Sequence, residues 1–373
     1  MRILFSSNVS WSIYNFRLDL LKSLQSEGHE IFVTASKDAY SDLLSNEGME
    51  FHETKINNNS QNPFSDLRLL WSYITLYKRL KLDVVLHNAI KPNIYGAMAA
   101  GILRIPVINN ISGLGTLFIT SSISTRIAKL LYRISQKFST VVFFQNPHDR
   151  QLFIDNGLAK GDKLKLVPGS GVDTNRFVNK RQRKENDRFA FLFIGRLLID
   201  KGIQEYVEAA QQVLKLFPET EFRILGPFYE SNSTSISKNQ LDSWVNSGVV
   251  NYIGTNDAVN EEMEKSDCVV LPSYREGLSK VLIEASSMSL PIITTDVPGC
   301  RDVVVDSKTG YLCKVKDSND LAKKMLRMLE LSNAKRLDMG AAARQRAIDV
   351  FDVEHVIEIY KREIKNLRKV NDV

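Results

Sequence analysis

Cysteine and histidine are scarce in this sequence, and their spacing is typical neither of disulfide cross-links nor of a metal site. The 373 residues include three cysteines, Cys268, Cys300 and Cys313, and five histidines. The cysteines form no C-x-x-C pair, and the histidines lie far apart along the chain. These counts and spacings predict neither a disulfide framework nor a zinc site, so we expect no bound metal and no cofactor.

Long apolar runs are also missing. No stretch approaches the roughly 20 residues that a membrane-spanning helix needs. Near the N-terminus only residues 3–5 are apolar before polar residues follow, which is too short for the core of a signal peptide. We therefore expect a cytoplasmic protein.

Two further signatures are absent. The sequence pI is about 9.0, but the cations are dispersed and no zinc-finger, RRM or helix-turn-helix pattern occurs, so we expect no nucleic-acid partner. A nicotinamide dehydrogenase would need G-x-G-x-x-G directly after a strand, and neither residues 6–13 nor residues 195–202 supply it. These observations exclude two common classes of basic or nucleotide-binding protein.

The composition and the order of apolar runs predict an α/β protein with two domains. A chain of 373 residues exceeds the size at which a single core stops growing, and 43% apolar with 25% charged residues is typical of a globular enzyme. Short apolar runs alternate with amphipathic stretches, and this order predicts parallel sheets with helices on both faces. The expected strands are residues 2–6, 30–35, 83–87, 106–111, 141–145 and 164–167, and then, after a polar connection at 179–188, residues 189–194, 221–225, 250–253, 268–271 and 291–295.

The most informative motif is LPSYREGLSKVLIEA at residues 271–285. A buried strand ends there at Pro272, Gly277 lets the backbone approach a ligand, and a helix is expected from Leu278. The N–H groups at such a helix start suit a diphosphate. Glu284 then lies about two turns inside the helix, where its two oxygens could accept both ribose hydroxyls, while Glu276 stays before the helix and near a sugar. The alternative is an exposed helix with ordinary surface acids.

A second motif, FAFLFIGRLLIDKG at residues 189–202, runs from an apolar strand into a loop with two cations. Arg196 offers a planar fork for phosphate oxygens and Lys201 a compact charge, so the loop after Gly195 is a candidate diphosphate clamp. A solvated basic loop is the alternative.

Together these motifs resemble glycosyltransferase family 4, the retaining, nucleotide-sugar-dependent enzymes of the GT-B fold. Glu276 and Glu284 match the family's E-x7-E pattern, and Gly195-Arg196 with Lys201 match its second-domain clamp. The segment at residues 169–173 with Phe177 resembles its N-G-V-D-x-x-x-F junction, with Ser170 replacing the asparagine. Within the family the chain is most similar to bacterial enzymes that add an N-acetylhexosamine to a polyprenyl-diphosphate-linked sugar, judged by residues 112–115 and 62–64.

The resemblance implies a domain division and a donor site. It implies two facing Rossmann-like domains: residues 1–178, joined by a C-terminal helix at 353–373 that crosses back, bind the acceptor, and residues 179–352 bind the nucleotide sugar, with hinges at 179–188 and before Asp352. The implied catalytic residues are Glu276, Arg196, Lys201 and His87. The implied donor-binding residues are Glu284, Gly195, Gly254, Ser273, Gly277, Leu278 and Ser279.

The first domain offers the acceptor-side candidates Asn8, Trp11, Asn88, Lys91 and Gly113. Asn8 and Trp11 lie in an expected loop at residues 8–13, which lacks the paired glycines of many relatives, and Trp11 could pack structurally or stack on a sugar. His87 follows an expected strand and could approach the donor sugar or be a satisfied buried imidazole. Asn88 and Lys91 share its loop.

The resemblance implies transfer of a hexose or N-acetylhexosamine, with GalNAc or GlcNAc as the best candidates, from a UDP-sugar to a polyprenyl-diphosphate-linked saccharide in surface polysaccharide or glycoprotein glycan assembly. No Asp-x-Asp triplet occurs, so Arg196, Lys201 and a helix N-terminus are expected to replace a metal at the diphosphate. The alternatives are a non-catalytic nucleotide-sugar-binding subunit and a UDP-sugar epimerase of similar shape.

Two amphipathic stretches, residues 68–82 and 122–138, mix cations with apolar and aromatic residues, and the second contains no acid. Such a mixture suits an anionic lipid surface, so a peripheral location on the inner face of the membrane is expected. The alternative is a pair of ordinary helices with inward apolar faces and solvated cations.

Overall fold

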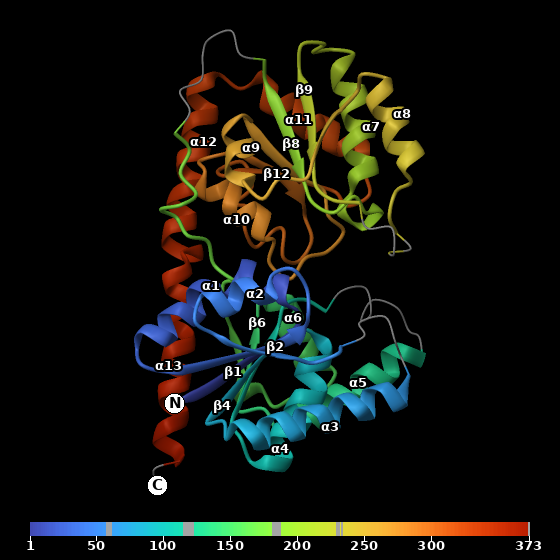
Figure 1. Cartoon of the computed structure of the whole chain (residues 1–373). Helices are drawn as coiled ribbons and strands as arrows, with labels where there is room; N and C mark the ends of the chain where they lie inside the picture. The colour runs from blue at the N-terminus through green and yellow to red at the C-terminus, as the bar shows by residue number, and fades with distance from the viewer. Residues whose placement is uncertain (57–61, 115–122, 181–187, 229–231, 233, 372–373) are drawn as a thin grey trace. The chain divides into compact units, whose positions relative to one another are not determined.

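The computed structural model describes residues 1–56, 62–114, 123–180, 188–228, 232 and 234–371, and within them the chain forms two compact units. The first unit comprises Met1–Gly171 and Val353–Val373, and the second comprises Val172–Asp352. Each unit is a parallel sheet between layers of helices (Figure 1). The expected α/β class and the two Rossmann-like domains are confirmed.

The first unit contains a seven-stranded sheet in the order β3-β2-β1-β4-β5-β6-β7. Its strands are β1 (Arg2–Val9), β2 (Glu30–Ser36), β3 (Glu50–Glu53), β4 (Val84–Asn88), β5 (Val107–Ile111), β6 (Val141–Phe144) and β7 (Leu164–Leu166). Its helices are α1 (Ser10–Ser26), α2 (Ser41–Asn46), α3 (Pro63–Leu80), the π-turn η1 (Pro92–Gly96), α4 (Ala97–Leu103), α5 (Ile123–Ser135), α6 (Pro147–Asp155), the 3₁₀ turn η3 (Gly161–Lys163) and α13 (Val353–Asn371).

The two faces of this sheet bury different helices, because alternate strand residues point to opposite sides. Leu4 and Val85 pack with α3, α4, α5 and α6, whereas Ile3 and Val84 pack with α1, α2 and α13. The C-terminal helix α13 contributes Val356, Ile357, Tyr360, Ile364 and Leu367 to that second core. The expected return of the C-terminal helix to the first domain is therefore confirmed.

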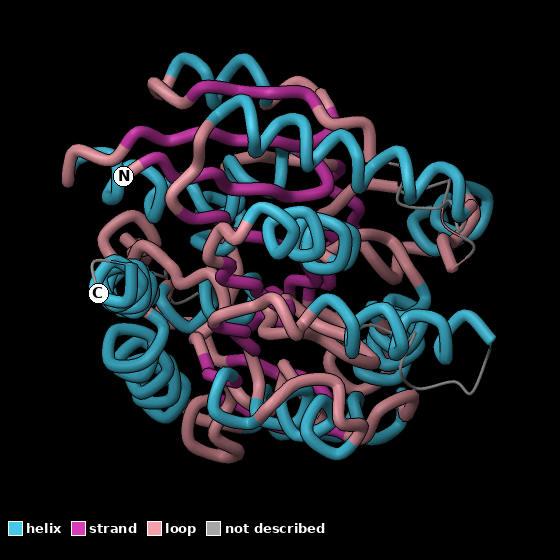
Figure 2. The backbone as a smooth tube through the Cα atoms, turned by 90° about the horizontal axis from the view of Figure 1, so that it is seen from below, coloured by secondary structure: helices cyan, strands magenta, loops and turns pink. Residues whose placement is uncertain are grey.

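The second unit contains a six-stranded sheet in the order β10-β9-β8-β11-β12-β13. Its strands are β8 (Ala190–Ile194), β9 (Glu221–Leu225), β10 (Asn251–Gly254), β11 (Cys268–Leu271), β12 (Ile292–Thr295) and β13 (Gly310–Cys313). Its helices are the 3₁₀ turn η4 (Ile199–Lys201), α7 (Ile203–Leu214), α8 (Lys238–Asn246), α9 (Val259–Glu264), α10 (Lys280–Ser287), α11 (Ser318–Glu330), α12 (Asn333–Arg346) and the π-turn η5 (Ala347–Phe351). Figure 2 shows the strands of the chain in magenta and the helices that flank them in cyan.

The first boundary between the units lies earlier than the expected boundary after residue 178. The backbone N–H of Val172 donates to the carbonyl of Phe351 at 2.8 Å, and Phe177 lies in the second hydrophobic core. Residues 172–178 thus belong to the second unit, and the chain crosses at Gly171–Val172 rather than in the expected hinge at 179–188, of which residues 181–187 lie outside the described residues. The second crossing, after Asp352, agrees with the expectation.

Candidate active site

The loops that follow β8 and β11 meet at the point where the strand order of the second sheet reverses direction. β8 pairs with β9 on one side and with β11 on the other, so the chain leaves these strands in opposite directions. Ligands of open parallel sheets bind at this switch point, beyond the carboxyl ends of the strands. The loop after β8 carries Gly195 and Arg196, and the loop after β11 carries Glu276.

An ion pair connects these two loops. Lys201 Nζ, at the end of η4, contacts Glu276 Oε1, and the two side chains are 20% and 15% exposed. The 3₁₀ turn is held in place because the backbone N–H of Tyr274 donates to the Asp200 carbonyl at 2.9 Å. Gly202 has a φ of 75°, and a Cβ there would lie 2.1 Å from the Pro272 carbonyl oxygen. The local geometry therefore places a cation from one motif and a carboxylate from the other side by side at the switch point.

Ser273, an expected donor-binding residue, ties the same loops together. Its side chain is fully buried, and its hydroxyl donates to the carbonyls of Asp200 at 3.2 Å and Arg275 at 3.3 Å. The carbonyl of Ser273 in turn accepts from the hydroxyl of Thr295 at the end of β12. The structure thus gives the Ser273 side chain a role in loop geometry.

The loop after β12 supports Glu276 from the other side. The backbone N–H of Glu276 donates to the Pro298 carbonyl at 3.2 Å, and that of Ser279 donates to the Gly299 carbonyl at 3.1 Å. Gly299 has a φ of 81°, and a Cβ at this position would lie 2.3 Å from the Glu276 carbonyl oxygen. Only glycine fits this close approach of two backbones.

Helix α10 begins slightly later than expected. The motif predicts a start at Leu278, but the helix runs Lys280–Ser287 with Ser279 as an extended N-cap residue. The hydroxyl of Ser279 does not cap the helix, while its backbone N–H is taken by Gly299. Glu284 therefore lies little more than one turn inside the helix, not two.

Glu284 is a buried carboxylate close to two cations. It is 8% exposed, and its Oε1 lies 3.8 Å from Lys280 Nζ. Burial raises the pKa of Glu284 to about 7, although the charges of Lys280 and Arg176 act in the opposite direction. The reading of an exposed helix with ordinary surface acids is therefore wrong for this residue. Sequence analysis missed Arg176, whose signal is its place next to Phe177 in the domain-junction motif.

The remaining expected donor residues line the same edge of the sheet. Arg196 is exposed, directly beyond the carboxyl end of β8. A Cβ at Gly226 would lie 1.9 Å from the Gly195 carbonyl oxygen, and the N–H of Gly226 donates to the carbonyl of Gly254 at 2.8 Å. Gly277 and Leu278 are partly buried in the loop before α10. Glycines thus bring the ends of β8, β9 and β10 together.

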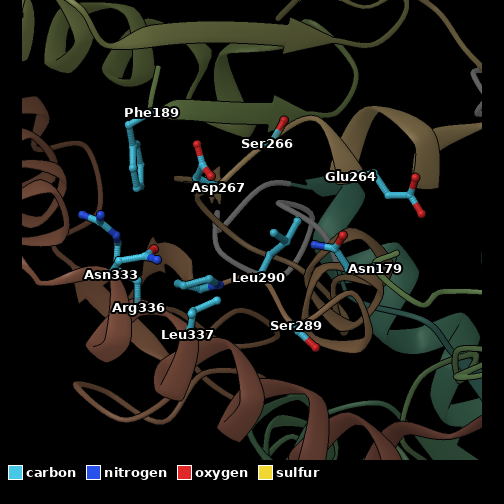
Figure 3. A pocket seen from close by; sticks show the side chains of 11 residues that line it. Asn179, Phe189, Glu264, Ser266, Asp267, Ser289, Leu290, Asn333, Arg336 and Leu337 are labelled. Carbon is cyan, nitrogen blue, oxygen red and sulfur yellow. The ribbon is translucent and has the colours of Figure 1, made fainter. Parts of the chain in front are cut away.

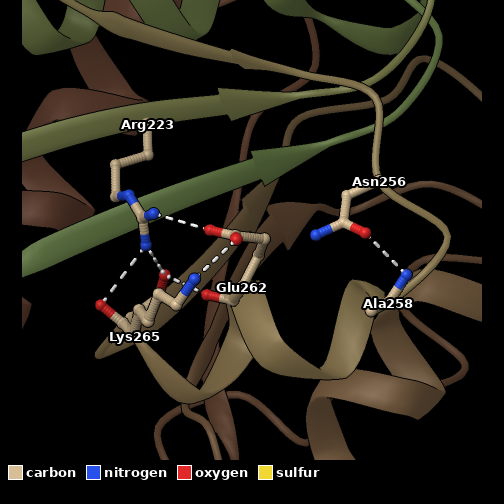
Figure 4. Close-up of polar contacts among 6 residues, drawn as sticks. Arg223, Asn256, Ala258, Glu262 and Lys265 are labelled. Carbon is tan, nitrogen blue, oxygen red and sulfur yellow. Dashed lines mark hydrogen bonds and ion pairs between the residues drawn. The ribbon is translucent and has the colours of Figure 1, made fainter.

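The loop beyond Gly254 is shaped by its own polar contacts, which Figure 4 shows. The side-chain oxygen of Asn256 accepts from the N–H of Ala258 at 2.8 Å. Behind it, Arg223 of β9 donates to Glu262 of α9 at 2.6 Å, and Lys265 donates to the other carboxylate oxygen at 2.8 Å. Burial acts to raise the pKa of Glu262, but these two cations outweigh it and lower the pKa. This buried network fixes α9 against the sheet.

A cavity in the second unit lies at the opposite end of its sheet. Its volume is about 300 Å³, and it is lined by residues that precede the strands, including Phe189 before β8, Asp267 before β11 and Leu290 before β12. Figure 3 shows their side chains around this space together with those of Arg336 and Leu337 from α12. The cavity is therefore separate from the switch point.

In the first unit, His87 is a fully packed side chain. It is 1% exposed, its Nε2 lies 2.9 Å from the Tyr77 hydroxyl, and its Nδ1 lies 2.8 Å from Asn109 Oδ1. Because that oxygen only accepts, Nδ1 donates and Nε2 accepts from the tyrosine. Burial lowers the pKa of His87 to about 4, and the hydrogen bond with Asn109 offsets only part of this effect. These contacts favour the satisfied imidazole and leave no ring nitrogen for a donor sugar.

The expected loop at residues 8–13 is instead a direct junction, because β1 runs to Val9 and α1 begins at Ser10. Trp11 is 43% exposed and packs edge-on against Phe16 with ring centroids 5.1 Å apart. Asn8, at the end of β1, has a buried Oδ1 with no hydrogen-bond partner among the described residues.

Asn88, at the end of the adjacent strand β4, has the same property. Its side chain is 8% exposed, and within the described structure its Oδ1 has no partner. Asn8 and Asn88 therefore place two unsatisfied amide oxygens at the switch point of the first sheet, between β1 and β4. Buried unpaired acceptors are costly unless a ligand or water completes them. The next residue, Ala89, has a φ of 78°, a strained conformation of the kind found at binding sites.

Lys91 and Gly113 are fixed by neighbouring helices. Lys91 Nζ lies 2.6 Å from Asp66 Oδ1 of α3, and the Tyr95 hydroxyl donates to the other oxygen of Asp66 at 2.7 Å. Gly113 has a φ of 139° beside Leu114, whose N–H donates to Asp149 of α6 at 3.3 Å. Gly115 of the same motif lies outside the described residues.

No group of three or more His, Cys, Asp or Glu side chains is placed to hold a metal ion within the described ranges. Likewise, none of the helices described here is both long enough and apolar enough to cross a membrane.

Comparisons with known proteins identify the family of this chain. Residues 175–346 match the family model described as glycosyl transferases group 1, and residues 2–146 match the one described as glycosyl transferase 4-like. The chain is a two-domain glycosyltransferase of the GT-B fold. It belongs to glycosyltransferase family 4.

Named relatives extend over most of the chain. A Campylobacter jejuni N,N'-diacetylbacillosaminyl-diphospho-undecaprenol alpha-1,3-N-acetylgalactosaminyltransferase is 28% identical over 98% of this chain and 100% of its own. An Escherichia coli UDP-Gal:alpha-D-GlcNAc-diphosphoundecaprenol alpha-1,3-galactosyltransferase is 26% identical over 83% of this chain and 79% of its own. The crystal structure of Anabaena Alr3699/HepE with UDP and glucose has a TM-score of 0.81 at 19% identity, over 98% and 99% of the two chains, and supports the fold.

Proposed function

We propose that this enzyme transfers an N-acetylhexosamine, GalNAc or GlcNAc, from a UDP-sugar to a hydroxyl of a polyprenyl-diphosphate-linked saccharide. The likeness to the Campylobacter N-acetylgalactosaminyltransferase along 98% of the chain carries the proposal for the sugar and the acceptor. The Lys201–Glu276 pair at the switch point supports the donor, because a cation for the diphosphate and a carboxylate for sugar hydroxyls stand side by side. The product would enter bacterial surface polysaccharide or glycoprotein glycan assembly.

In this reaction the bond between C1 of the sugar and the β-phosphate oxygen breaks, and a bond between C1 and the acceptor oxygen forms on the same face. The acceptor proton passes to a β-phosphate oxygen, so UDP leaves protonated. Because the new bond forms on the face from which UDP departs, the anomeric configuration is retained. Arg196, Lys201 and the first turn of α10 would stabilise the charge on the departing diphosphate. Glu276 would orient sugar hydroxyls and Glu284 would accept the ribose hydroxyls.

The acceptor would bind the first unit. The amide oxygens of Asn8 and Asn88 are buried without a partner among the described residues, and such oxygens are suitable acceptors for sugar hydroxyls. A polyprenyl tail would hold the substrate in a bilayer, so we place the enzyme peripherally on the inner face of the cell membrane. The family assignment and the named relatives are transferases, which leaves neither a non-catalytic subunit nor an epimerase as the better reading.

The test is a transfer assay with a short-chain polyprenyl-diphosphate-linked saccharide and a panel of UDP-sugars, followed by mass spectrometry and NMR of the anomeric proton. We expect transfer from UDP-GalNAc or UDP-GlcNAc with an α-linked product. The double variant Arg196→Ala with Lys201→Ala should lower kcat by roughly 10²–10³-fold, the effect of removing charge stabilisation at a leaving group.

The matched control removes two exposed cations of the same unit, Lys215→Ala with Lys238→Ala, and should keep wild-type turnover. Wild-type turnover in the Arg196 and Lys201 double variant would eliminate the diphosphate clamp. An inverted product would eliminate the proposed same-face substitution.

A further inference from the structure

Helix α5 exposes most of its branched apolar side chains, and apart from Tyr132 its buried residues are small or polar. The described face that packs on the first unit consists of Thr125, Ala128, Tyr132 and Ser135. The outward residues follow helical spacing and are large: Ile123, Ile127, Leu130 and Ile134 are 77%, 53%, 53% and 40% exposed. An amphipathic helix of a globular domain normally does the reverse, with the apolar stripe inward. Scattered exposed apolar side chains are ordinary, but a continuous stripe is not.

Helix α3 repeats this pattern in the same layer. Its inward residues Leu69, Tyr73 and Tyr77 fill the core, while Phe64, Leu67 and Trp71 are 83%, 53% and 61% exposed at spacings of three and four. Asn62 caps the helix through its side-chain oxygen, which accepts from the N–H of Phe64 at 3.0 Å, so this first turn with its bare phenyl ring is well formed. We call the seven outward residues Phe64, Leu67, Trp71, Ile123, Ile127, Leu130 and Ile134 the apolar face.

Helix α4 contacts both α3 and α5 and joins them into one layer over the sheet (Figure 1). Gly101 on α4 lies so close to the ring that follows α5 that a Cβ there would be 2.3 Å from Phe138 Cδ1. Ile102, the next residue of α4, is 60% exposed. The two stripes thus lie on helices of one layer, on the same face of the first sheet.

The charges on this side have one sign. Within α3 and α5 the only acid is Asp66, and it is occupied by Lys91 and Tyr95. The cations of the two helices are Arg68, Lys78, Arg79, Arg126, Lys129 and Arg133. Arg133 donates to the carbonyls of Asn156 and Gly157, which are neutral groups that leave its charge in place. Apolar residues flanked by these cations fit a lipid surface, which has an apolar interior and anionic headgroups.

We propose that the apolar face is a docking surface for an anionic phospholipid bilayer. The aromatic and branched side chains would enter the boundary between headgroups and acyl chains, while the flanking cations would remain among the phosphates. This inference rests on the proposed function, whose acceptor carries a polyprenyl tail. Asp66 lies on α3 between Phe64 and Leu67 and holds the acceptor-side candidate Lys91, so the docking helix directly positions a loop of the proposed acceptor site.

The experiment is flotation of the full chain with vesicles of equimolar phosphatidylglycerol and phosphatidylcholine, compared with vesicles of phosphatidylcholine alone. We expect binding to the first kind, weakened by salt. The variant Ile127→Ser with Leu130→Ser should lower the bound fraction roughly tenfold or more, because it removes apolar area from the buried side of the contact. Arg126→Gln with Arg133→Gln should weaken binding to the anionic vesicles and flatten the salt dependence.

Matched controls lie in the second unit. Leu216 and Leu337 are both 66% exposed, so Leu216→Ser with Leu337→Ser removes a similar exposed apolar area, and Lys215→Gln with Lys238→Gln removes two charges. Both controls should float like the wild type. All variants are also assayed with the short-chain acceptor in detergent-free solution, where the apolar-face variant should keep its turnover.

Equal flotation of the wild type and the Ile127 and Leu130 variant would overturn the docking surface, as would a wild type that transfers sugar in solution but does not float. A wild type that forms dimers through this face, lost in the same variant, and ignores vesicles would also overturn it. Flotation without transfer of any sugar would instead reject the proposed function and leave the docking surface standing.

Discussion

At the residue scale, Glu284 is held in a place that disfavours its charged form. The carboxylate is 8% exposed, and burial raises its pKa to about 7, above the ordinary 4.5. The folded state therefore binds this proton more tightly than the unfolded chain, so its contribution to stability is full below about pH 4.5 and is lost as the pH rises through 7. A role of the charged Glu284 carboxylate in ligand binding would explain why the chain keeps a residue that lowers the stability of the fold at neutral pH.

Replacing Glu284 by glutamine should separate these two effects. We expect Glu284→Gln to raise the free energy of unfolding at pH 8 by roughly 1–3 kcal/mol, measured by urea denaturation, because the buried charge is gone. The same variant should weaken UDP binding in calorimetry by about 1.5–3 kcal/mol, the value of a hydrogen bond to a charged group. Unchanged UDP affinity would remove the ribose role; the exposed Glu330→Gln serves as the control for both measurements.

The two motifs could predict that Lys201, Glu276 and Glu284 all follow strands of the second sheet, because strand, turn and helix lengths fix where these residues fall along the chain. The ion pair between Lys201 and Glu276 was not predicted, since it joins two loops that are far apart in the sequence. Nor could the sequence decide the role of His87. That decision depends on Tyr77 of α3 and Asn109 of β5, which occupy its two ring nitrogens. Partners that come from other elements leave no local trace in the sequence.

At the element scale, the candidate site is a set of loops held by backbone contacts. Gly299 illustrates this, because its place is fixed both by a φ of 81° and by the carbonyl of Glu276, which would lie 2.3 Å from an added Cβ. A methyl group there must displace the loop that carries Glu276. In the proposed mechanism Glu276 orients the sugar hydroxyls, so small shifts of this loop should lower turnover strongly.

We expect Gly299→Ala to lower kcat by about 10²-fold, the scale of a misplacement near 1 Å, in a steady-state transfer assay. Gly248→Ala is the matched control, since Gly248 has a φ of 73° but nothing within 4 Å of the added Cβ. Both variants carry the strain of a positive φ, but only the first also meets the Glu276 loop, so only the first should lose turnover. Equal turnover of the two would show that the loop contact does not matter.

Most strands could be predicted as apolar runs, and β3 and β13 could not. β3 reads EFHE and is only partly buried at the sheet edge, while β13 begins with a glycine. The start of α10 was also shifted, since the Gly299 carbonyl takes the N–H of Ser279 and delays the first turn. Edge strands and helix starts are set by tertiary contacts that a local pattern does not contain.

At the scale of the whole molecule, charge neutralisation by protein groups should make the enzyme independent of divalent metal. Turnover measured in EDTA should equal turnover in buffer, and added Mg²⁺ should not raise it, because in the proposed mechanism Lys201, Arg196 and the first turn of α10 stabilise the charge of the diphosphate. Loss of activity in EDTA that Mg²⁺ restores would contradict this. The absence of an Asp-x-Asp triplet is the sequence feature behind the expectation.

The domain order could be predicted from the restart of the strand pattern, but the boundary could not. The polar stretch at 179–188 looked like a linker, whereas Phe177 already lies in the second core and Val172 bonds to Phe351. A polar stretch indicates that the chain is exposed to solvent, but an exposed stretch need not be the junction between two domains.

The pairing of Val172 with Asp352 has an evolutionary consequence. Residues 172–352 form a unit inserted into the first one, and the first and last residues of the insertion lie close together. The flanking residues Gly171 and Val353 are also in contact, since a Cβ at Gly171 would lie 2.6 Å from Val353 Cα. Recombination at the two adjacent junctions, 171/172 and 352/353, could exchange the whole second unit, which we propose binds the donor, without cutting either core. New combinations of donor and acceptor could therefore arise by shuffling rather than by gradual remodelling of a pocket.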